Sequence, residues 1–454
     1  MNLSTARSYK RFGWAPSPGI GKIQWADPAL WCVTVLGCLS VCFAILLYCQ
    51  NIFFQDEWAL FTIFDKYGAK PNFWRPANEH RIVLTRLIYF GLMKMGHLDV
   101  RYVMIISQCL LWATMIPLSS AINVFGWKRW ALFLIIGFMY ASPAHVENQL
   151  WGFQIQWYFV FFSVMVSTYF LTRPSFRPSD FIIAHLVMLL AFLGTSIWPV
   201  VMLNAGILIG IRILKDISKI KWLLLWAAIF AIEIVLYFYD LNAVGNRGFA
   251  FNLKRLDYTM VALGNLISLR SNVFEHPGRI ALIFGYLGVS YVAVLFFLKK
   301  YHRQAFVWGL IQFAILAAIV IALGRAHLGV VQALSSRYAL MTMPLWIGVV
   351  LCSQEFRRFD VLLLIFLTIN LTLNSIYRFP GYEGGFKRRE AGRYCYYRVM
   401  KSPFDEIVQN ISDFRACRKL YPNEMILIRR MKMLQKQGKY FEGCVEQNGH
   451  TLCY

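Results

Sequence analysis

The sequence predicts an all-α polytopic membrane protein, and three observations support this fold class. Of its 454 residues, 58% are hydrophobic and only 15% are charged, whereas a soluble chain carries about 25% charged residues. Apolar runs of roughly twenty residues, the length that crosses a bilayer core, recur along the chain. The runs are continuously apolar, unlike the alternating strands of a membrane β-barrel. A soluble enzyme, a secreted disulfide scaffold and a disordered chain are therefore excluded.

About eleven transmembrane helices are expected from these runs. The first run, near 29–49, is too long for a signal-peptide core and lacks a small-residue cleavage site, so we expect it to remain as a helix. Prolines interrupt the run near 130–146 and the pair near 181–196 and 199–214, and one of these is a candidate re-entrant segment. The other runs lie near 100–125, 156–172, 222–240, 279–298, 305–323, 338–353 and 361–378.

Lysine and arginine residues predict the orientation. They precede the first run and fill alternate short loops, whereas the links near 147–155 and 196–198 contain none. Because cytoplasmic loops concentrate Lys and Arg, we expect the segment 1–28 in the cytoplasm. An odd number of spans then places the tail 379–454 outside. The net charge of +23 is in part this topology signal, so it does not indicate a nucleic-acid partner.

Three larger segments are expected on the outer face. They are the loops 50–99 and 240–278 of a membrane domain spanning 29–378, and the tail 379–454. The tail contains four cysteines, which in an oxidising compartment would form two disulfides in one of three pairings. A zinc site is the alternative, although no CxxC or HxxxH spacing is present. The four residues are Cys395, Cys417, Cys444 and Cys453.

Two adjacent carboxylates, Asp56 and Glu57, directly follow the first span. Partial removal of a carboxylate from water raises its affinity for a proton, which suits a general base. Adjacent helical residues point about 100° apart, so one side chain is expected to reach a substrate while the other orients it or binds a divalent metal. Ordinary solvation of a helix end is the alternative interpretation.

The same loop continues into a second polar cluster. Glu79, His80 and Arg81 are residue types that bind a phosphate or sugar hydroxyls. The alternative is a helix N-cap at Asn78 followed by an acidic first turn. The stretch 82–95 is apolar with polar interruptions, which predicts an interfacial helix along the outer leaflet.

Later outer segments add further candidate ligands. Amides and aromatic residues alternate over 147–157, a composition that suits either a sugar or an aromatic belt at the membrane interface. Arginines at the mouth of a membrane cavity suit a lipid phosphate, with snorkelling anchors as the alternative. The candidate ligands in these segments are Gln154, Arg270, Arg325, His327, Arg337 and Tyr338.

These features resemble the GT-C superfamily of membrane glycosyltransferases. The likeness lies in a cytoplasmic N-terminus, a first span leading into Asp56-Glu57, an interfacial helix and outer arginines, and it covers most of 29–378. It implies that Asp56 is the catalytic base beside Glu57 and that the donor is a polyprenyl-phosphate sugar, such as an undecaprenyl-phosphate sugar. The size, odd span count and outer tail further resemble bacterial O-antigen-modifying glucosyltransferases. This implies an inner-membrane location and a glycan acceptor such as O-antigen.

The expected chemistry is an inverting transfer on the outer face. A carboxylate takes the proton of the acceptor hydroxyl, and cations stabilise the departing lipid phosphate. Arg325 and Arg337, with His80 or Arg81, are expected to hold that phosphate. One alternative is an O-antigen polymerase or ligase with a diphosphate-linked donor. The other is a flippase or transporter, which the intramembrane Glu233 would favour.

The predicted topology is tested by reporters. A periplasm-active phosphatase fused after Tyr454 should be active, because the tail lies outside, and a fluorescent protein there should stay dark. The control fusion after Arg129, in a predicted cytoplasmic loop, should behave in the opposite way. A cytoplasmic signal after Tyr454 would overturn the topology and the outer-face site with it.

Overall fold

The protein is a bundle of apolar helices. Among the residues described in the computed structural model, eight helices are long and apolar enough to cross a membrane, and three shorter apolar helices coincide with the rest of the eleven expected runs. The chain is therefore a multi-pass helical membrane protein. The described residues are 25–64, 72–77, 80–95, 99–214, 216–241, 252–269, 276–298, 305–355, 357–401, 403, 406–407, 417, 423–436, 444–447 and 450–453.

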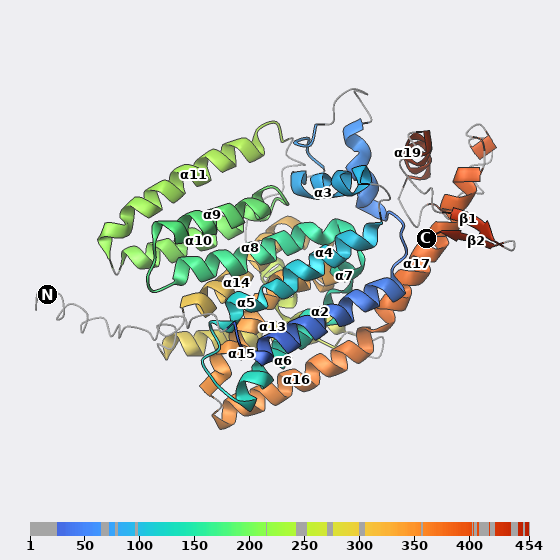
Figure 1. Cartoon of the computed structure of the whole chain (residues 1–454). Helices are drawn as coiled ribbons and strands as arrows, with labels where there is room; N and C mark the ends of the chain where they lie inside the picture. The colour runs from blue at the N-terminus through green and yellow to red at the C-terminus, as the bar shows by residue number, and fades with distance from the viewer. Residues whose placement is uncertain are drawn as a thin grey trace, which may run out of the picture.

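The apolar helices of the bundle lie side by side (Figure 1). These are α2 (Pro28–Tyr48), α4 (Val100–Ala113), α5 (Met115–Ser119), α6 (Trp127–Ala141), α8 (Ile155–Thr172), α9 (Pro178–Phe192), α10 (Trp198–Ile213), α11 (Ile220–Phe238), α13 (Pro277–Phe297), α14 (Ala305–Arg325), α15 (Ser336–Cys352) and α16 (Arg358–Arg378). Their outward faces carry exposed apolar side chains, such as Leu36, Phe43 and Leu362, each more than 60% exposed. Exposed apolar surface of this extent suits contact with lipid.

Shorter elements connect and cover the bundle. They are the 3₁₀ segments η1 (Gln55–Phe64), η2 (Pro143–His145), η3 (Gly152–Gln154), η4 (Ile217–Lys219), η6 (Ala326–Leu328), η7 (Val330–Leu334) and η8 (Ser353–Glu355), the helices α3 (Val83–Lys94), α7 (Val146–Leu150), α12 (Leu253–Gly264), α17 (Pro380–Lys401) and α19 (Glu424–Lys436), and the strands β1 (Cys444–Gln447) and β2 (His450–Cys453).

Three expected spans are short. The helices α9, α10 and α15 have 15, 16 and 17 residues, or about 23–26 Å at 1.5 Å per residue, against a bilayer core of about 30 Å. Prolines open α9 and α10, because the first helical turn tolerates a missing N–H. Both helices still run between the two ends of the bundle, so the re-entrant turn considered for this region is not observed.

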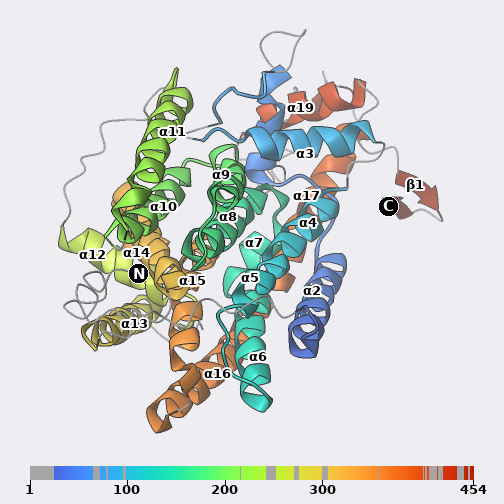
Figure 2. The ribbon, with the colours of Figure 1, turned by 60° about the vertical axis from the view of Figure 1, so that its left-hand side comes forward.

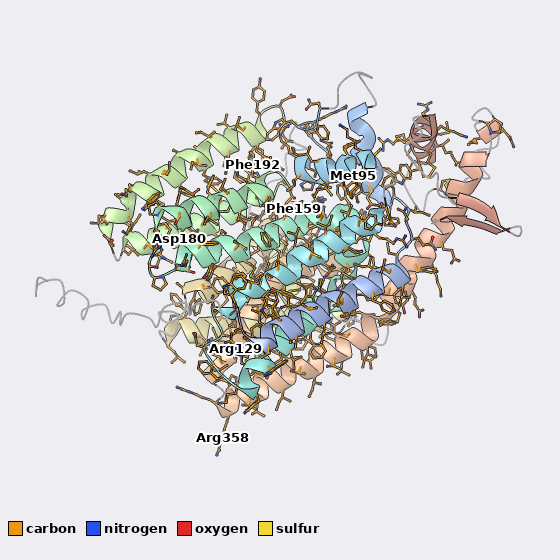
Figure 3. All side chains as sticks on the ribbon, viewed as in Figure 1. Met95, Arg129, Phe159, Asp180, Phe192 and Arg358 are labelled. Atoms are coloured by element: carbon orange, nitrogen blue, oxygen red, sulfur yellow. A yellow bond between two sulfur atoms is a disulfide. The ribbon has the colours of Figure 1, made fainter. Side chains whose placement is uncertain are left out.

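The connecting segments gather at two opposite ends. At the first, here called the Asp27 end, Arg129 Nε contacts Asp27 Oδ2 at 2.5 Å and the Asn123 N–H donates to Gln354 Oε1 at 2.8 Å. Figure 3 shows Arg129, Asp180 and Arg358 towards this end and Met95 and Phe192 towards the other. We call the opposite end the Asp56 end.

Helix α3 occupies the segment in which an interfacial helix is predicted. Figure 2 shows α3 lying across the ends of the bundle helices beside α19. Its polar residues face the protein: Thr85, Arg86 and Tyr89 are buried, whereas Leu87 is 47% exposed. The Arg86 guanidinium donates to the carbonyl of Phe73 at 2.9 Å, and burial lowers the pKa of Arg86 to about 10, so it stays charged at neutral pH.

The middle outer loop, expected as a loop over 240–278, contains a packed helix instead. Helix α12 lies against α13 so closely that a Cβ on Gly264 would come within 1.9 Å of the Ala281 carbonyl oxygen. The Asn265 amide then donates to the Ser335 carbonyl at 3.0 Å, which ties α12 to α15. Lys254, Arg255 and Asp257 interrupt the apolar pattern at the start of α12, so no span was predicted there.

The tail packs at the Asp56 end. Helix α17 directly follows α16, and the Arg430 guanidinium of α19 donates to the Trp58 carbonyl at 2.9 Å. The cysteine pairing that the sequence left open is resolved for one disulfide, Cys395–Cys417. Cys444 lies opposite Cys453 in the antiparallel β1–β2 pair. Part of the tail therefore contacts the loop that follows α2.

The intramembrane Glu233 has a partner that the sequence alone could not identify. His185 Nε2 of α9 lies 3.2 Å from Glu233 Oε1 of α11, and both side chains are largely buried. Helix α11 lies at the edge of the bundle (Figure 1), where little else holds a polar residue away from lipid. The pair therefore joins α11 to α9 and satisfies one carboxylate oxygen.

Candidate functional site

The Glu57 carboxylate ties three segments together at the Asp56 end. It is fully buried. The Tyr89 hydroxyl donates to Oε1 at 2.6 Å, the Phe153 N–H donates to Oε1 at 3.2 Å, and the Phe54 N–H donates to Oε2 at 2.6 Å. Because Glu57 is inaccessible and accepts these bonds, its place is that of a positioning residue, not of a base in contact with substrate.

Asp56 occupies the more accessible position of the acidic pair. Its side chain is half-buried, at the start of the 3₁₀ segment η1. The preceding Gln55 is exposed and has a φ of +45°, a left-handed conformation that is costly for a residue with a Cβ. Such a conformation persists where its surroundings hold it, and here the Glu57 hydrogen bonds hold the same turn.

A cavity of about 210 Å³ opens next to this turn. Four segments meet there: the beginning of the loop after α2, α7 with the residue after it, the start of α15, and α17. The lining residues are Phe54, Gln55, Val146, Glu147, Leu150, Trp151, Arg337, Gly381 and Gly385.

The polar groups of the cavity form a small network around Arg337. Its Nε lies 3.5 Å from Glu147 Oε2 and donates to Ser335 Oγ at 3.2 Å. The Ser335 hydroxyl in turn donates to Glu147 Oε2 at 3.1 Å. The side chains of Arg337 and Glu147 are 32% and 42% exposed, so a ligand can reach both. The arginine also lies over the Trp151 ring, 5.9 Å from its centroid.

Arg325 and Arg337 both act electrostatically on one tyrosine of α12, Tyr258. Burial is the main cause that raises the pKa of Tyr258, and the neighbouring Tyr338 raises it further. Both arginines act on Tyr258 in the opposite direction, because a positive charge favours the phenolate. Three of the predicted ligands, Arg325 of α14 and Arg337 and Tyr338 of α15, therefore influence the same tyrosine, and Arg337 is the one of the three that lines the cavity.

Two other predicted ligands hold the first loop in place. The His80 Nδ1 atom lies 2.6 Å from the Ser196 hydroxyl oxygen, which links the loop to the turn between α9 and α10. Arg81 is buried, and its guanidinium donates to the carbonyls of Trp74, Tyr237 and Tyr239. Desolvation lowers the pKa of Arg81. Neither residue lines the cavity. Both side chains instead attach the first loop to neighbouring segments.

The remaining predicted residues lie apart from the cavity lining or outside the described residues. Gln154 is buried, and its Oε1 has no hydrogen-bond partner. His327 is exposed in η6. Glu79 and Arg270 lie outside the described residues. Within the described ranges, no group of three or more His, Cys, Asp or Glu side chains is arranged to hold a metal ion.

Several lining residues were missed by the sequence prediction. Glu147 and Trp151 belong to the segment 147–157, whose amides and aromatic residues predict a ligand site. The pattern alone does not show that these two side chains line the cavity and that Gln154 does not. Gly381 and Gly385 have no functional group, and only their position against α7 reveals them.

Comparison with protein-family models, with curated proteins and with solved structures finds no match to this chain.

Replacement of Glu57 should destabilise the protein. Glu57→Ala leaves buried N–H and O–H donors without an acceptor, at about 1–3 kcal/mol each, and thermal unfolding in detergent should show a lower midpoint. Glu147→Ala removes a carboxylate that is 42% exposed and should leave the midpoint nearly unchanged. Equal midpoints for Glu57→Ala and the unmodified protein would contradict the positioning role.

Proposed function

We propose that this protein is a GT-C-like glycosyltransferase that moves a sugar from a polyprenyl-phosphate donor to a glycan acceptor on the outer face of a bacterial inner membrane. The observation that carries the proposal is the cavity at the Asp56 end. It combines a guanidinium, a carboxylate and an aromatic wall at the rim of a membrane bundle. A lipid phosphate needs a cation there, and a sugar ring needs hydroxyl partners and an apolar surface.

The proposed reaction uses Asp56 as the base. Asp56 takes the proton from the acceptor hydroxyl, whose oxygen attacks the anomeric carbon from the side opposite the phosphate. The bond between that carbon and the phosphate oxygen breaks, the configuration inverts, and polyprenyl phosphate leaves. Arg337 and Arg325 stabilise the negative charge on the departing phosphate. No strong general acid is required, because the phosphate is a good leaving group.

The neighbouring carboxylates have supporting roles in this proposal. Glu147 contacts Arg337 Nε and accepts the Ser335 hydroxyl, so it orients the arginine. Glu57 holds the turn that presents Asp56. The isoprenoid tail of the donor would lie between bundle helices, where apolar side chains face lipid.

Two alternatives make different demands on the same molecule. A polymerase or ligase would use a diphosphate-linked donor at the same cavity. A transporter would use polar groups within the membrane, and the His185–Glu233 pair is the observation that favours it. Mass spectrometry of surface glycan with and without the gene distinguishes these functions. One added sugar supports the proposal, and a changed chain length supports the polymerase. An unmodified glycan contradicts both enzymatic functions.

Asp56→Asn should abolish the glycan modification. The amide keeps the size of the side chain but cannot accept a proton, so transfer should fall by at least about a hundredfold. The measurement is the modified fraction of surface glycan at equal membrane expression. Glu383→Gln, an exposed acid at the same end of the bundle, is the matched control and should modify normally. Full modification by Asp56→Asn would reject Asp56 as the base.

Arg337→Ala should raise the donor requirement selectively. A charge-assisted hydrogen bond to phosphate contributes about 1.5–3 kcal/mol, so the apparent KM for the donor should rise by about tenfold or more, with the KM for the acceptor unchanged. Steady-state kinetics of the purified protein with each substrate varied in turn measures both. Arg358→Ala, at the Asp27 end, should leave both constants unchanged. A rise confined to the acceptor would reassign Arg337.

A further inference from the structure

One wall of the cavity is a helix of the tail that contributes no side chain. Gly381 and Gly385 of α17 both line the cavity. They are four residues apart, so they lie on the same face of the helix. A Cβ on Gly381 would approach Val146 Cγ1 at 3.4 Å, and a Cβ on Gly385 would approach Leu150 Cδ1 at 3.1 Å. Larger side chains at these two positions would therefore occupy the cavity.

Helix α17 is held firmly against the bundle at this point. The hydroxyl of the buried Tyr382 donates to Gln149 Oε1 of α7. The Tyr382 ring also contacts the rings of Tyr48 and Phe379, each at a centroid distance of 5.6 Å. The glycine wall therefore has a defined position, although glycine inside a helix costs about 1 kcal/mol relative to alanine. Glycine at these two helical positions therefore indicates that the space beside them is needed.

The volume and the lining indicate what the space holds. Pockets for drug-sized ligands measure about 300–1,000 Å³, and this cavity is smaller, at about 210 Å³. Its lining combines two aromatic side chains, two aliphatic side chains, an amide, a carboxylate and a guanidinium. The Trp151 ring is fixed, because its Nε1–H donates to the Phe54 carbonyl at 3.1 Å. A single pyranose, with apolar ring faces and hydroxyls at its edge, matches this lining.

We propose that this cavity binds one sugar unit and that Gly381 and Gly385 of the tail helix set the largest sugar accepted. The proposal rests on the proposed function, which it deepens by naming a monosaccharide unit and its size-determining wall. The volume of about 210 Å³ suits a single hexose, and a bulkier sugar needs the space that side chains at Gly381 and Gly385 would take. The tail is thereby a specificity element.

The test uses full-length protein in nanodiscs and a short-chain prenyl-phosphate hexose with a diazirine on the sugar. Cross-links should map to 146–151 or 381–385. They should fall by at least about tenfold in Gly381→Leu and Gly385→Leu, because a side chain fills a tight site. Gly384→Leu is the matched control: it lies on the same helix, it does not line the cavity and an added Cβ meets no atom within 4 Å. It should cross-link normally.

Alanine variants keep the test decisive if a leucine variant fails to fold. Gly381→Ala places its Cβ at ordinary contact distance from Val146, so it should still bind the hexose probe and lose the N-acetylhexosamine probe. Cross-links elsewhere, or glycine-wall variants equal to the unmodified protein, overturn the sugar cavity even if glycan transfer proceeds. Cross-links at the cavity without any glycan transfer support the sugar cavity and overturn the proposed function instead.

Discussion

The buried carboxylate of Glu57 is the interaction on which the Asp56 end depends. It accepts hydrogen bonds from the loop after α2, from α3 and from the link before α8. These three segments lie apart in the sequence. A carboxylate removed from water is costly unless hydrogen bonds satisfy it, and the bonds it accepts here compensate that cost. The strained turn at Gln55 and the position of Asp56 follow from this attachment.

The arginines of the Asp56 end divide into two groups by their partners. Arg81 and Arg378 are buried and donate to backbone carbonyls at the ends of helices and turns. A guanidinium has five donors, so one arginine can satisfy several carbonyls at the ends of helices and turns at once. Arg325 and Arg337 remain partly exposed and share Tyr258 as a neighbour. Of these arginines, Arg337 is the one that lines the cavity.

The cavity arises where the tail covers the end of the bundle. Without α17, the surface of α7 beside Trp151 would be open, and Arg337 and Glu147 would lie on an exposed rim. The glycines of α17 allow the helix to approach closely while a space is kept. The tail disulfide Cys395–Cys417 and the Arg430 contact to Trp58 hold the rest of the tail nearby.

The sequence by itself determined the helical membrane class, the apolar segments and the helix within 82–95. These follow from local composition and periodicity, which a single chain displays directly. It did not reveal helix α12 or the pairing of His185 with Glu233. It also did not reveal that Glu57 is fully buried whereas Asp56 is partly exposed. Those depend on which segments meet in three dimensions. Arg81 and Arg337 look equivalent as outer arginines in the sequence, and only tertiary packing decides that one meets carbonyls and the other a cavity.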